Sequence, residues 1–423
     1  MKSPLFKTLA AVGIGVLMFL CGWFLRNGGW ERLKEDWTGN YRERPWPGHG
    51  PLALGPDGYY WGITRDSQAM PGYLYKMKAD GSGWKIIHTF LPEGSPPARI
   101  DPQGAMVFDG VDSMLGTTAE GGDSGGNGTL YKVNVKTGVL TTLVEFTDRQ
   151  GLHVGRMPRA PLVPDGLGSF WGSTVLGGSN HKGTLFKYHL ATGVFTTVVE
   201  LPAPPNSQTP LPGPQNALTS DGKGSWWGTM RYGGTESCGT IFKLKADTGE
   251  LTTVVEFTED HDGKEPGGTL VSDGRGFLWG ACCRGGKVHG TVFKVDATTG
   301  ALTTVVEFTG AAGSNLGASP WTTLVDDGQG FLWGCTPEGG SYDGGTLFKM
   351  DIASGALTTV VEFQRDESRH KGHRPYGALV NDGHGSFLGI TGEGGKRNAG
   401  TIFKVDVKTG VLTTLVEFGK VGP

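Results

Sequence analysis

The 19 residues from Gly400 to Phe418, GTIFKVDVKTGVLTTLVEF, recur along the chain and decide its fold. Close copies end at Phe146, Leu201, Phe257, Phe308 and Phe363, and a more divergent first copy, GYLYKMKADGSGWKIIHTF, ends at Phe90. One lysine marks the period, about 55 residues long, in all seven copies: Lys76, Lys132, Lys187, Lys243, Lys294, Lys349 and Lys404. A fixed period of this length indicates a repeat architecture in which each copy is one structural unit.

Each copy predicts four short strands, as the fifth copy shows. GGTLV (267–271) is followed by the turn signal Asp273-Gly274, and FLWGAC (277–282) by a Gly-Gly loop. TVFKVD (291–296) and the β-branched ALTTVVEF (301–308) flank a second turn. Four antiparallel strands per repeat are typical of a propeller. We therefore predict an all-β domain over residues 51–423, a seven-bladed β-propeller of four-stranded antiparallel blades.

A tryptophan followed by glycine recurs on the second strand, where a neighbouring sheet has to approach closely. We predict that these residues pack blade against blade rather than bind a ligand: Trp61, Trp171, Trp227, Trp279 and Trp333. Leu115 and Leu388 take the same place in copies two and seven. The recurrent lysine is predicted to pair across the third and fourth strands with a recurrent glutamate: Glu145, Glu200, Glu256, Glu307, Glu362 or Glu417.

The N-terminal segment predicts a membrane anchor. Lys2 and Lys7 precede an uncharged apolar run from Leu9 to Leu25, which is at the short end for spanning a bilayer and also fits a signal peptide. An A-x-A-like cleavage site is lacking, and three tryptophans follow where an interfacial belt would lie. We predict a single-pass transmembrane helix in residues 1–28 and a juxtamembrane linker in 29–50. The propeller is then on the periplasmic side of a bacterial inner membrane.

These repeats resemble the GloVer tandem-repeat proteins, named from Gloeobacter and Verrucomicrobia. Their pattern is a W/Y-G-T-T-like strand, a GG loop, G-T-[VIL]-[FY]-K-x-[DN]-x-x-[TS]-G, and an L-x-x-[VL]-x-x-F strand. The match covers about residues 50–418, and the first copy departs from it by lacking the GG loop. The resemblance implies an exported or surface-anchored propeller. It implies no catalytic residue, because the shared motif is structural.

Composition excludes several classes of function. A formal net charge of −3 argues against a nucleic-acid partner, which would show as a basic stripe. The five cysteines form no CxxC pair, and no nucleophile elbow, phosphate loop or HExxH sequence occurs. We expect no cofactor and no bound metal. Cys238, Cys282, Cys283 and Cys335 are predicted to be buried thiols, with a disulfide between repeats as the alternative.

Loops that differ between copies are the candidates for function, since loops on a rigid scaffold tolerate change. The loops between second and third strands, and the connections between repeats, emerge on one face of a propeller. Two basic clusters on it are candidate partner-binding residues: His153, Arg156 and Arg159, and Arg369, His370, Lys371, His373 and Arg374. They suit an acidic protein or anionic lipid headgroups, and the alternative is a solvated loop surface. His370 and His373 as metal ligands, and the Asp-Gly-x-Gly turns (Asp165, Asp221, Asp273, Asp327, Asp382) as calcium ligands, are weaker alternatives.

The predicted function is a non-enzymatic extracytoplasmic scaffold, held at the membrane by its helix and docking a protein as an accessory subunit of a membrane complex. The short linker favours this function because it keeps the disc near the bilayer. A glycan-binding propeller using Trp321, Tyr342 and Tyr376 is the second hypothesis. A propeller hydrolase or lyase is the third.

Overall fold

The computed structural model describes residues 46–47, 51–65, 72–91, 100–123, 125–202, 213–258, 263–286, 289–366 and 371–419. The predicted anchor (1–28) lies outside these residues, as does most of the predicted linker (29–50). Within the described ranges, no helix is long and apolar enough to cross a membrane. Trp46–Pro47, inside the predicted linker, form a strand that pairs with blade 1.

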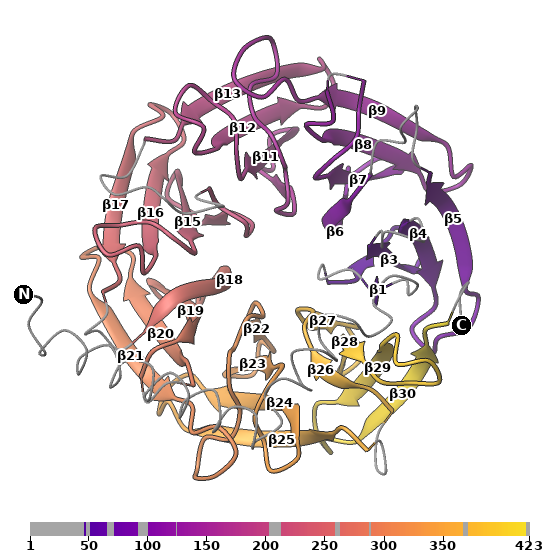
Figure 1. Ribbon diagram of the computed structural model, residues 1–423, viewed down its shortest axis with the longest axis vertical. Helices are drawn as coiled ribbons and strands as arrows, with labels where there is room; N and C mark the ends of the chain where they lie inside the picture. Colours follow the sequence, from indigo (N-terminus) through magenta and orange to yellow (C-terminus); the bar gives the residue numbers. More distant parts are fainter. Residues whose placement is uncertain are drawn as a thin grey trace, which may run out of the picture.

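Seven antiparallel sheets stand around a central axis, which confirms the predicted seven-bladed propeller (Figure 1). Blade 1 contains β1 (Trp46–Pro47), β2 (Ala53–Leu54), β3 (Tyr60–Arg65), β4 (Gly72–Met77) and β5 (Lys85–Phe90). Blade 2 contains β6 (Pro102–Phe108), β7 (Ser113–Thr118), β8 (Thr129–Asn134) and β9 (Leu140–Glu145). Blade 3 contains β10 (Val163–Pro164), β11 (Ser169–Thr174), β12 (Thr184–His189) and β13 (Val194–Glu200).

Blade 4 contains β14 (Thr219–Ser220), β15 (Ser225–Met230), β16 (Thr240–Lys245) and β17 (Leu251–Glu256). Blade 5 contains β18 (Lys264–Ser272), β19 (Phe277–Arg284), β20 (Thr291–Asp296) and β21 (Leu302–Glu307). Blade 6 contains β22 (Val325–Asp326), β23 (Phe331–Thr336), β24 (Asp343–Asp351) and β25 (Leu357–Gln364). Blade 7 contains β26 (His373–Pro375), β27 (Val380–Asn381), β28 (Ser386–Glu393), β29 (Thr401–Asp406) and β30 (Leu412–Glu417).

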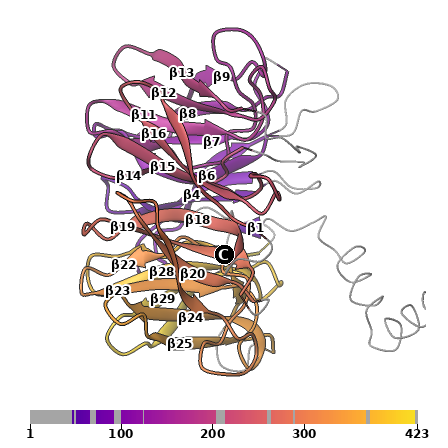
Figure 2. The same cartoon turned by 90° about the vertical axis from the view of Figure 1, so that its left-hand side faces the viewer.

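Every blade is built from consecutive strands, with the first strand nearest the axis and the last at the rim (Figure 1). Seen from its edge, the ring is a disc (Figure 2). Each copy of the sequence is therefore one blade, and none of the described strands is exchanged between the two ends of the ring.

The tryptophan column lies in the interfaces between blades. Trp279 of blade 5, for example, is 1% exposed and packs with Leu324, Leu332 and Phe348 of blade 6. The glycine after it serves its own blade, because a Cβ at Gly280 would lie 2.5 Å from the Phe293 ring on the neighbouring strand. The Trp-Gly pair thus fills one interface and leaves room for an aromatic ring beneath it.

Blade 7 meets blade 1 through the same kind of contact as the other blades. A Cβ on the turn glycine Gly300 would meet Val254 on the rim strand of the preceding blade, and Gly81 of blade 1 meets Leu415 of blade 7 likewise. Tyr75 of blade 1 packs in one apolar cluster with Ile402 and Phe418 of blade 7. Side-chain packing therefore closes the ring.

The cysteines that the structure describes are all free and buried: Cys238, Cys282, Cys283 and Cys335. Burial raises the pKa of the Cys283 thiol to about 12 and holds that of Cys335 well above its ordinary value. These thiols stay protonated at neutral pH, so they are part of the packing rather than nucleophiles.

Candidate functional site

The predicted pairing of the recurrent lysine with the recurrent glutamate is wrong. Lys187 stands opposite Thr196, whereas Glu200 stands opposite Thr184, so the two side chains lie at different ends of the strand pair. Lys187 instead pairs with Asp165 at 3.0 Å, in the turn between the first two strands. Glu200 accepts a hydrogen bond from the backbone N–H of Ser179 in the Gly-Gly loop at 2.6 Å.

The recurrent Asp-Gly-x-Gly turn carries a shared structural module. In blade 4, Asp221 accepts hydrogen bonds from the N–H groups of Lys223 and Ser225 and from Nε1 of Trp227, while Lys243 lies over the Trp227 ring at 5.0 Å. Burial alone would raise the pKa of Asp221, but these hydrogen bonds and Lys243 outweigh it and lower that pKa. The carboxylate thus already accepts hydrogen bonds from the backbone of its own turn, which is the usual role of aspartate in turns. In the part of the chain that the structure describes, no group of three His, Cys, Asp or Glu side chains gathers to hold a metal.

At the opposite ends of the strands, the two variable loop sets lie together. The backbone of Arg156, in the connection between blades 2 and 3, exchanges hydrogen bonds with Leu176 beside the Gly-Gly loop of blade 3. The backbone N–H of Ala318 likewise donates to the carbonyl oxygen of Glu338 of blade 6. We call this side of the disc the loop face.

The first basic cluster is spread across the loop face. His153 lies at the rim, where Nδ1 is 3.0 Å from the carbonyl oxygen of Glu145 and the ring meets Phe195 of the outermost strand edge-on. Arg159 lies just before the innermost strand of the same blade, and both arginines, Arg156 and Arg159, are half-buried. These residues do not converge on one point.

Two of the five residues of the second cluster pair with a carboxylate within blade 7. Arg369 and His370 lie outside the described residues, and Lys371 is exposed. His373 Nε2 and Arg374 Nη1 contact the two carboxylate oxygens of Glu393 at 3.2 and 3.0 Å. Burial alone would raise the pKa of Glu393, but the hydrogen bond from His373 and the charge of Arg374 lower it. Partner binding by either cluster stays a prediction.

The structure reveals a set of positions near the axis whose side chains vary from blade to blade. A proline recurs at one place on the innermost segment of blades 2 to 7: Pro102, Pro158, Pro214, Pro266, Pro320 and Pro375. It packs on the preceding blade, since a Cβ at Gly290 would lie 2.6 Å from Pro320 Cδ. The residue before it has a positive φ in four blades although none is glycine: Met157, Glu265, Ser319 and Arg374. One backbone geometry thus carries four different side chains, which marks these positions as candidates for function.

Four side chains from blades 4 to 6 form one cluster here, which we call the Arg–Trp cluster: Arg231, Glu265, Arg284 and Trp321. Arg231 donates from Nε and Nη2 to Glu265 Oε2 at 3.1 and 2.6 Å, and its guanidinium lies 3.7 Å from the centre of the Trp321 ring. Arg284 Nη1 contacts the other oxygen, Oε1, at 3.3 Å. Glu265 is 9% exposed, so two cations from different blades share one buried carboxylate.

Charged side chains follow at the equivalent places of blades 6 and 7, and together with the Arg–Trp cluster we call them the charged arc. In blades 6 and 7 the carboxylates of Glu338 and Glu393 outnumber the guanidinium of Arg374. Ser319 donates to Glu338 Oε2 at 3.0 Å, and Arg374 pairs with Glu393. Burial alone would lower the pKa of Arg374, but nearby negative charges, first that of Glu393 and also that of Glu338, raise it. The sequence signal for this arc was the residue before each Gly-Gly pair (Tyr232, Arg284, Glu338, Glu393), which changes while the glycines do not.

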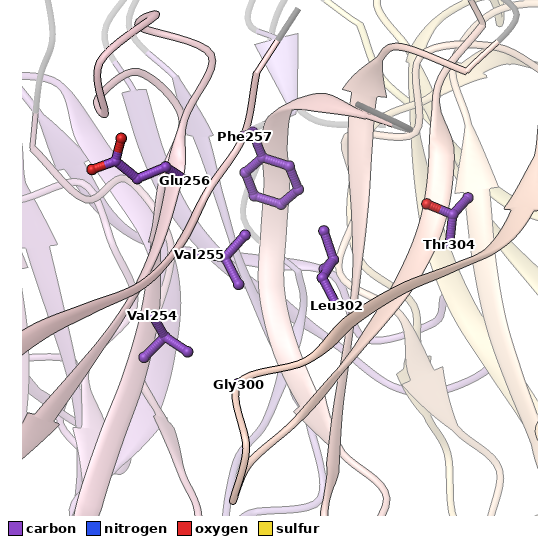
Figure 3. Close-up of a pocket in the computed structure, with 7 residues that line it drawn as sticks. All are labelled: Val254, Val255, Glu256, Phe257, Gly300, Leu302 and Thr304. Carbon is purple, nitrogen blue, oxygen red and sulfur yellow. The ribbon is translucent and has the colours of Figure 1, made fainter. Parts of the chain in front are cut away.

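A pocket of about 330 Å³ lies between the rim strand β17 of blade 4 and strand β21 with its preceding turn in blade 5 (Figure 3). It is lined by Val254, Val255, Glu256, Phe257, Gly300, Leu302 and Thr304. The close approach of Gly300 to Val254 recurs at Gly355 with Val305 and at Gly410 with Val360. The pocket is therefore a groove of the repeated blade packing.

Comparison with solved structures shows the fold. The chain resembles a puromycin-hydrolyzing peptidase of Mycobacterium tuberculosis (TM-score 0.54, 10% identity), covering 89% of this chain and 54% of that one. It also resembles the propeller domain of the Trilobed protease of Pyrococcus furiosus, described as having an open velcro topology (TM-score 0.52, 9% identity, 89% and 99% covered). A prolyl endopeptidase gives a TM-score of 0.51 at 12% identity, with 93% and 54% covered. The chain spans about half the length of the two peptidases, and identities this low show the fold alone.

No curated protein sequence matches the chain. The model of the Gloeobacter/Verrucomicrobia repeat matches residues 47–289 and 213–422, which together span the seven blades. The chain therefore belongs to the Gloeobacter/Verrucomicrobia repeat family.

Proposed function

We propose that this protein is a non-enzymatic, membrane-anchored extracytoplasmic scaffold that docks a protein partner through the loop face of blades 4 to 7. The Arg–Trp cluster is the observation that carries the proposal. Arginine, tryptophan and tyrosine are the residues that most often dominate binding at protein interfaces. Here Arg231 stacks on Trp321 and lies 5.0 Å from the centre of the Tyr232 ring.

The cluster breaks the repeat, which separates it from the scaffold. The Asp–Trp–Lys module occurs in blade after blade and is explained by packing and turn chemistry. Glu265 and Arg284 have Met157 and Leu176 at the corresponding places of blade 3. Blade 3 thus has the same strand order without these charged side chains.

The described residues support a catalytic function less well than they support docking. The thiols Cys282 and Cys283 are buried and carry raised pKa values, so neither supplies a thiolate. The carboxylates Glu265 and Glu393 are each held by two basic side chains, which suits recognition and structure better than proton transfer. Anchoring by residues 1–28 rests on the apolar run of the sequence.

A glycan-binding propeller is the second candidate, and one observation favours it. Trp321 and Tyr376 each follow the recurrent proline, in blades 6 and 7, so two aromatic rings occupy equivalent places on adjacent blades. Trp321 is 37% exposed, which leaves ring surface for a ligand.

The test is extraction of native membranes with a mild detergent, followed by native gel separation and mass spectrometry. We expect the chain in the membrane fraction and in one stoichiometric complex. Trp321→Ala should release it from that complex, whereas Arg275→Ala, an exposed arginine on the opposite face of blade 5, should not. A wild-type chain that migrates alone overturns the proposal.

A further inference from the structure

The Arg–Trp cluster has a chemical preference that deepens the docking proposal and rests on it. Its core is pre-organised: Arg231 donates two hydrogen bonds to Oε2 of Glu265 and is covered by the Trp321 ring. Only 20% of the Arg231 side chain and 11% of the Glu265 side chain are exposed. A ligand therefore meets these groups already fixed, which lowers the entropy cost of binding.

Arg284 is the outward part of the cluster. It touches Glu265 through Nη1, while 64% of its side chain faces solvent. The cluster holds two guanidinium groups and one carboxylate, so it carries an excess of one positive charge. A guanidinium presents several N–H donors in a planar fork that matches a carboxylate, so Arg284 is suited to a second, external carboxylate.

The aromatic ring joins the cluster through its other arginine, Arg231. The Trp321 backbone lies against Gly267 of blade 5, since a Cβ there would be 3.3 Å from Trp321 Cα. The ring stacks on Arg231, and part of it remains exposed. An acidic group next to an apolar side chain would therefore find both of its contacts here.

The neighbouring blades limit how much negative charge the ligand carries. Glu338 and Glu393 belong to the same arc, next to Arg374. A uniformly charged polyanion crossing blades 4 to 7 would meet these carboxylates, and like charges repel. The arc instead suits one localised carboxylate followed by neutral or basic groups, which a peptide supplies more readily than a polyuronate.

We infer that the Arg–Trp cluster binds a single carboxylate within an acidic, otherwise mixed peptide segment of the docked partner, with Arg284 pairing the carboxylate and Trp321 packing beside it.

The experiment uses the purified full chain in mild detergent on one array that carries random heptapeptides and oligogalacturonates. We expect peptides with one Asp or Glu beside an apolar residue to be enriched, and their Gln or Asn counterparts to bind about tenfold more weakly, as for loss of one charge-assisted contact. Arg284→Ala should remove that preference and Trp321→Ala should lower all peptide signals. Arg275→Ala should leave both unchanged. Arg284 is exposed, so its truncation leaves the fold intact, which a melting curve verifies.

Two results overturn the inference. In the first, Arg284→Ala binds the same peptides as the wild type, or neither protein shows a preference for acidic peptides. In the second, binding that depends on Arg284 is confined to the oligogalacturonates, which assigns the cluster to a glycan. A chain that stays in its native membrane complex but fails this array keeps the docking function and loses the inference, whereas a chain that migrates alone on the native gel loses the docking function itself.

Discussion

Replacing Asp221 tests the module that holds each blade together. Its Oδ1 accepts from the N–H groups of Lys223 (2.8 Å) and Ser225 (3.0 Å), and its Oδ2 accepts from Trp227 Nε1 (3.3 Å). Trp227 is 1% and Ser225 8% exposed, so water cannot easily replace the lost acceptor in Asp221→Ala. Each buried donor left without a partner costs about 1–3 kcal/mol, and we expect Asp221→Ala to lose about 3 kcal/mol of unfolding free energy.

Asp221→Asn separates the two halves of the module. The amide oxygen can still accept from Lys223 and Ser225, while the NH₂ group replaces the acceptor of Trp227 and faces Lys243. We expect a loss of about 1–2 kcal/mol, less than for alanine. At roughly 2.1 cal/mol/K of unfolding entropy per residue, a propeller of this size loses about 1–2 °C in Tm for each kcal/mol.

The assay is urea and thermal unfolding of the purified chain, followed by circular dichroism and tryptophan fluorescence. Asp247→Ala is the matched control, because Asp247 is an exposed turn aspartate of the same blade whose Oδ1 accepts from its neighbour Thr248. It should cost less than about 0.5 kcal/mol. An unfolding free energy for Asp221→Ala equal to that of Asp247→Ala would refute the reasoning, and equal losses for Asp221→Ala and Asp221→Asn would refute the role given to the backbone donors.

Three further predictions concern the same scaffold. Burial alone would raise the pKa values of four turn aspartates, but lysine and hydrogen-bond partners lower all four: Asp57, Asp165, Asp221 and Asp382. The stability that these carboxylates contribute is complete above the ordinary pKa of 3.8 and is lost as the pH falls below it through the folded-state values. The urea midpoint should therefore drop in that pH window, and Asp221→Asn should make the drop shallower. Tyr75 buries its hydroxyl, which finds no hydrogen-bond partner among the described residues, so Tyr75→Phe should keep or raise the unfolding free energy by about 1 kcal/mol. A clear loss there, larger than for Tyr131→Phe, whose hydroxyl contacts Met106 Sδ at 3.4 Å, would contradict this. Trp84→Ala should remove about 3 kcal/mol and speed hydrogen exchange mainly in blades 1 and 7, whereas equal acceleration in all blades would show that Trp84 has no special part in closing the ring.

The repeat predicted the fold because its signals are local. Each signal specifies a strand or a hairpin within a few residues: the β-branched run before Phe418, the Thr-Gly turn and the Asp-Gly-x-Gly turn. Seven copies of such a four-stranded unit fit one architecture, the seven-bladed propeller. The pairing of lysine with glutamate failed for a reason that local sequence does not contain. Two side chains on neighbouring strands pair only if the register places them opposite each other, and here Glu200 stands opposite Thr184, three positions along the strand from Lys187.

The candidate site was out of reach of the sequence for a related reason. Arg231 and Glu265 are 34 residues apart and lie in different blades, and Trp321 lies in a third. Their convergence depends on the ring, which brings equivalent positions of successive copies side by side. The basic loop clusters were visible because their residues are adjacent in sequence, yet the structure spreads one of them from rim to axis and pairs much of the other with Glu393.

Blades 1 and 7 come from the two ends of the repeat region and meet at one interface of the ring. Six interfaces join blades that are consecutive in the chain, whereas the contact of blade 7 with blade 1 joins residues from its two ends. At this seam Trp84 takes the place that Leu412 has in the last copy. It stacks on Tyr75 at 4.2 Å and meets Phe418 edge-on at 5.7 Å, so three rings from both ends of the repeat region form one contact. Aromatic pairs contribute about 0.5–1.5 kcal/mol beyond the area that they bury. The same arrangement recurs between blades 2 and 3, where Phe195 takes the place of Trp84, stacks on Phe186 at 5.2 Å and meets Phe146 edge-on at 5.8 Å. The seam is therefore packed in the same way as an interface between two consecutive blades.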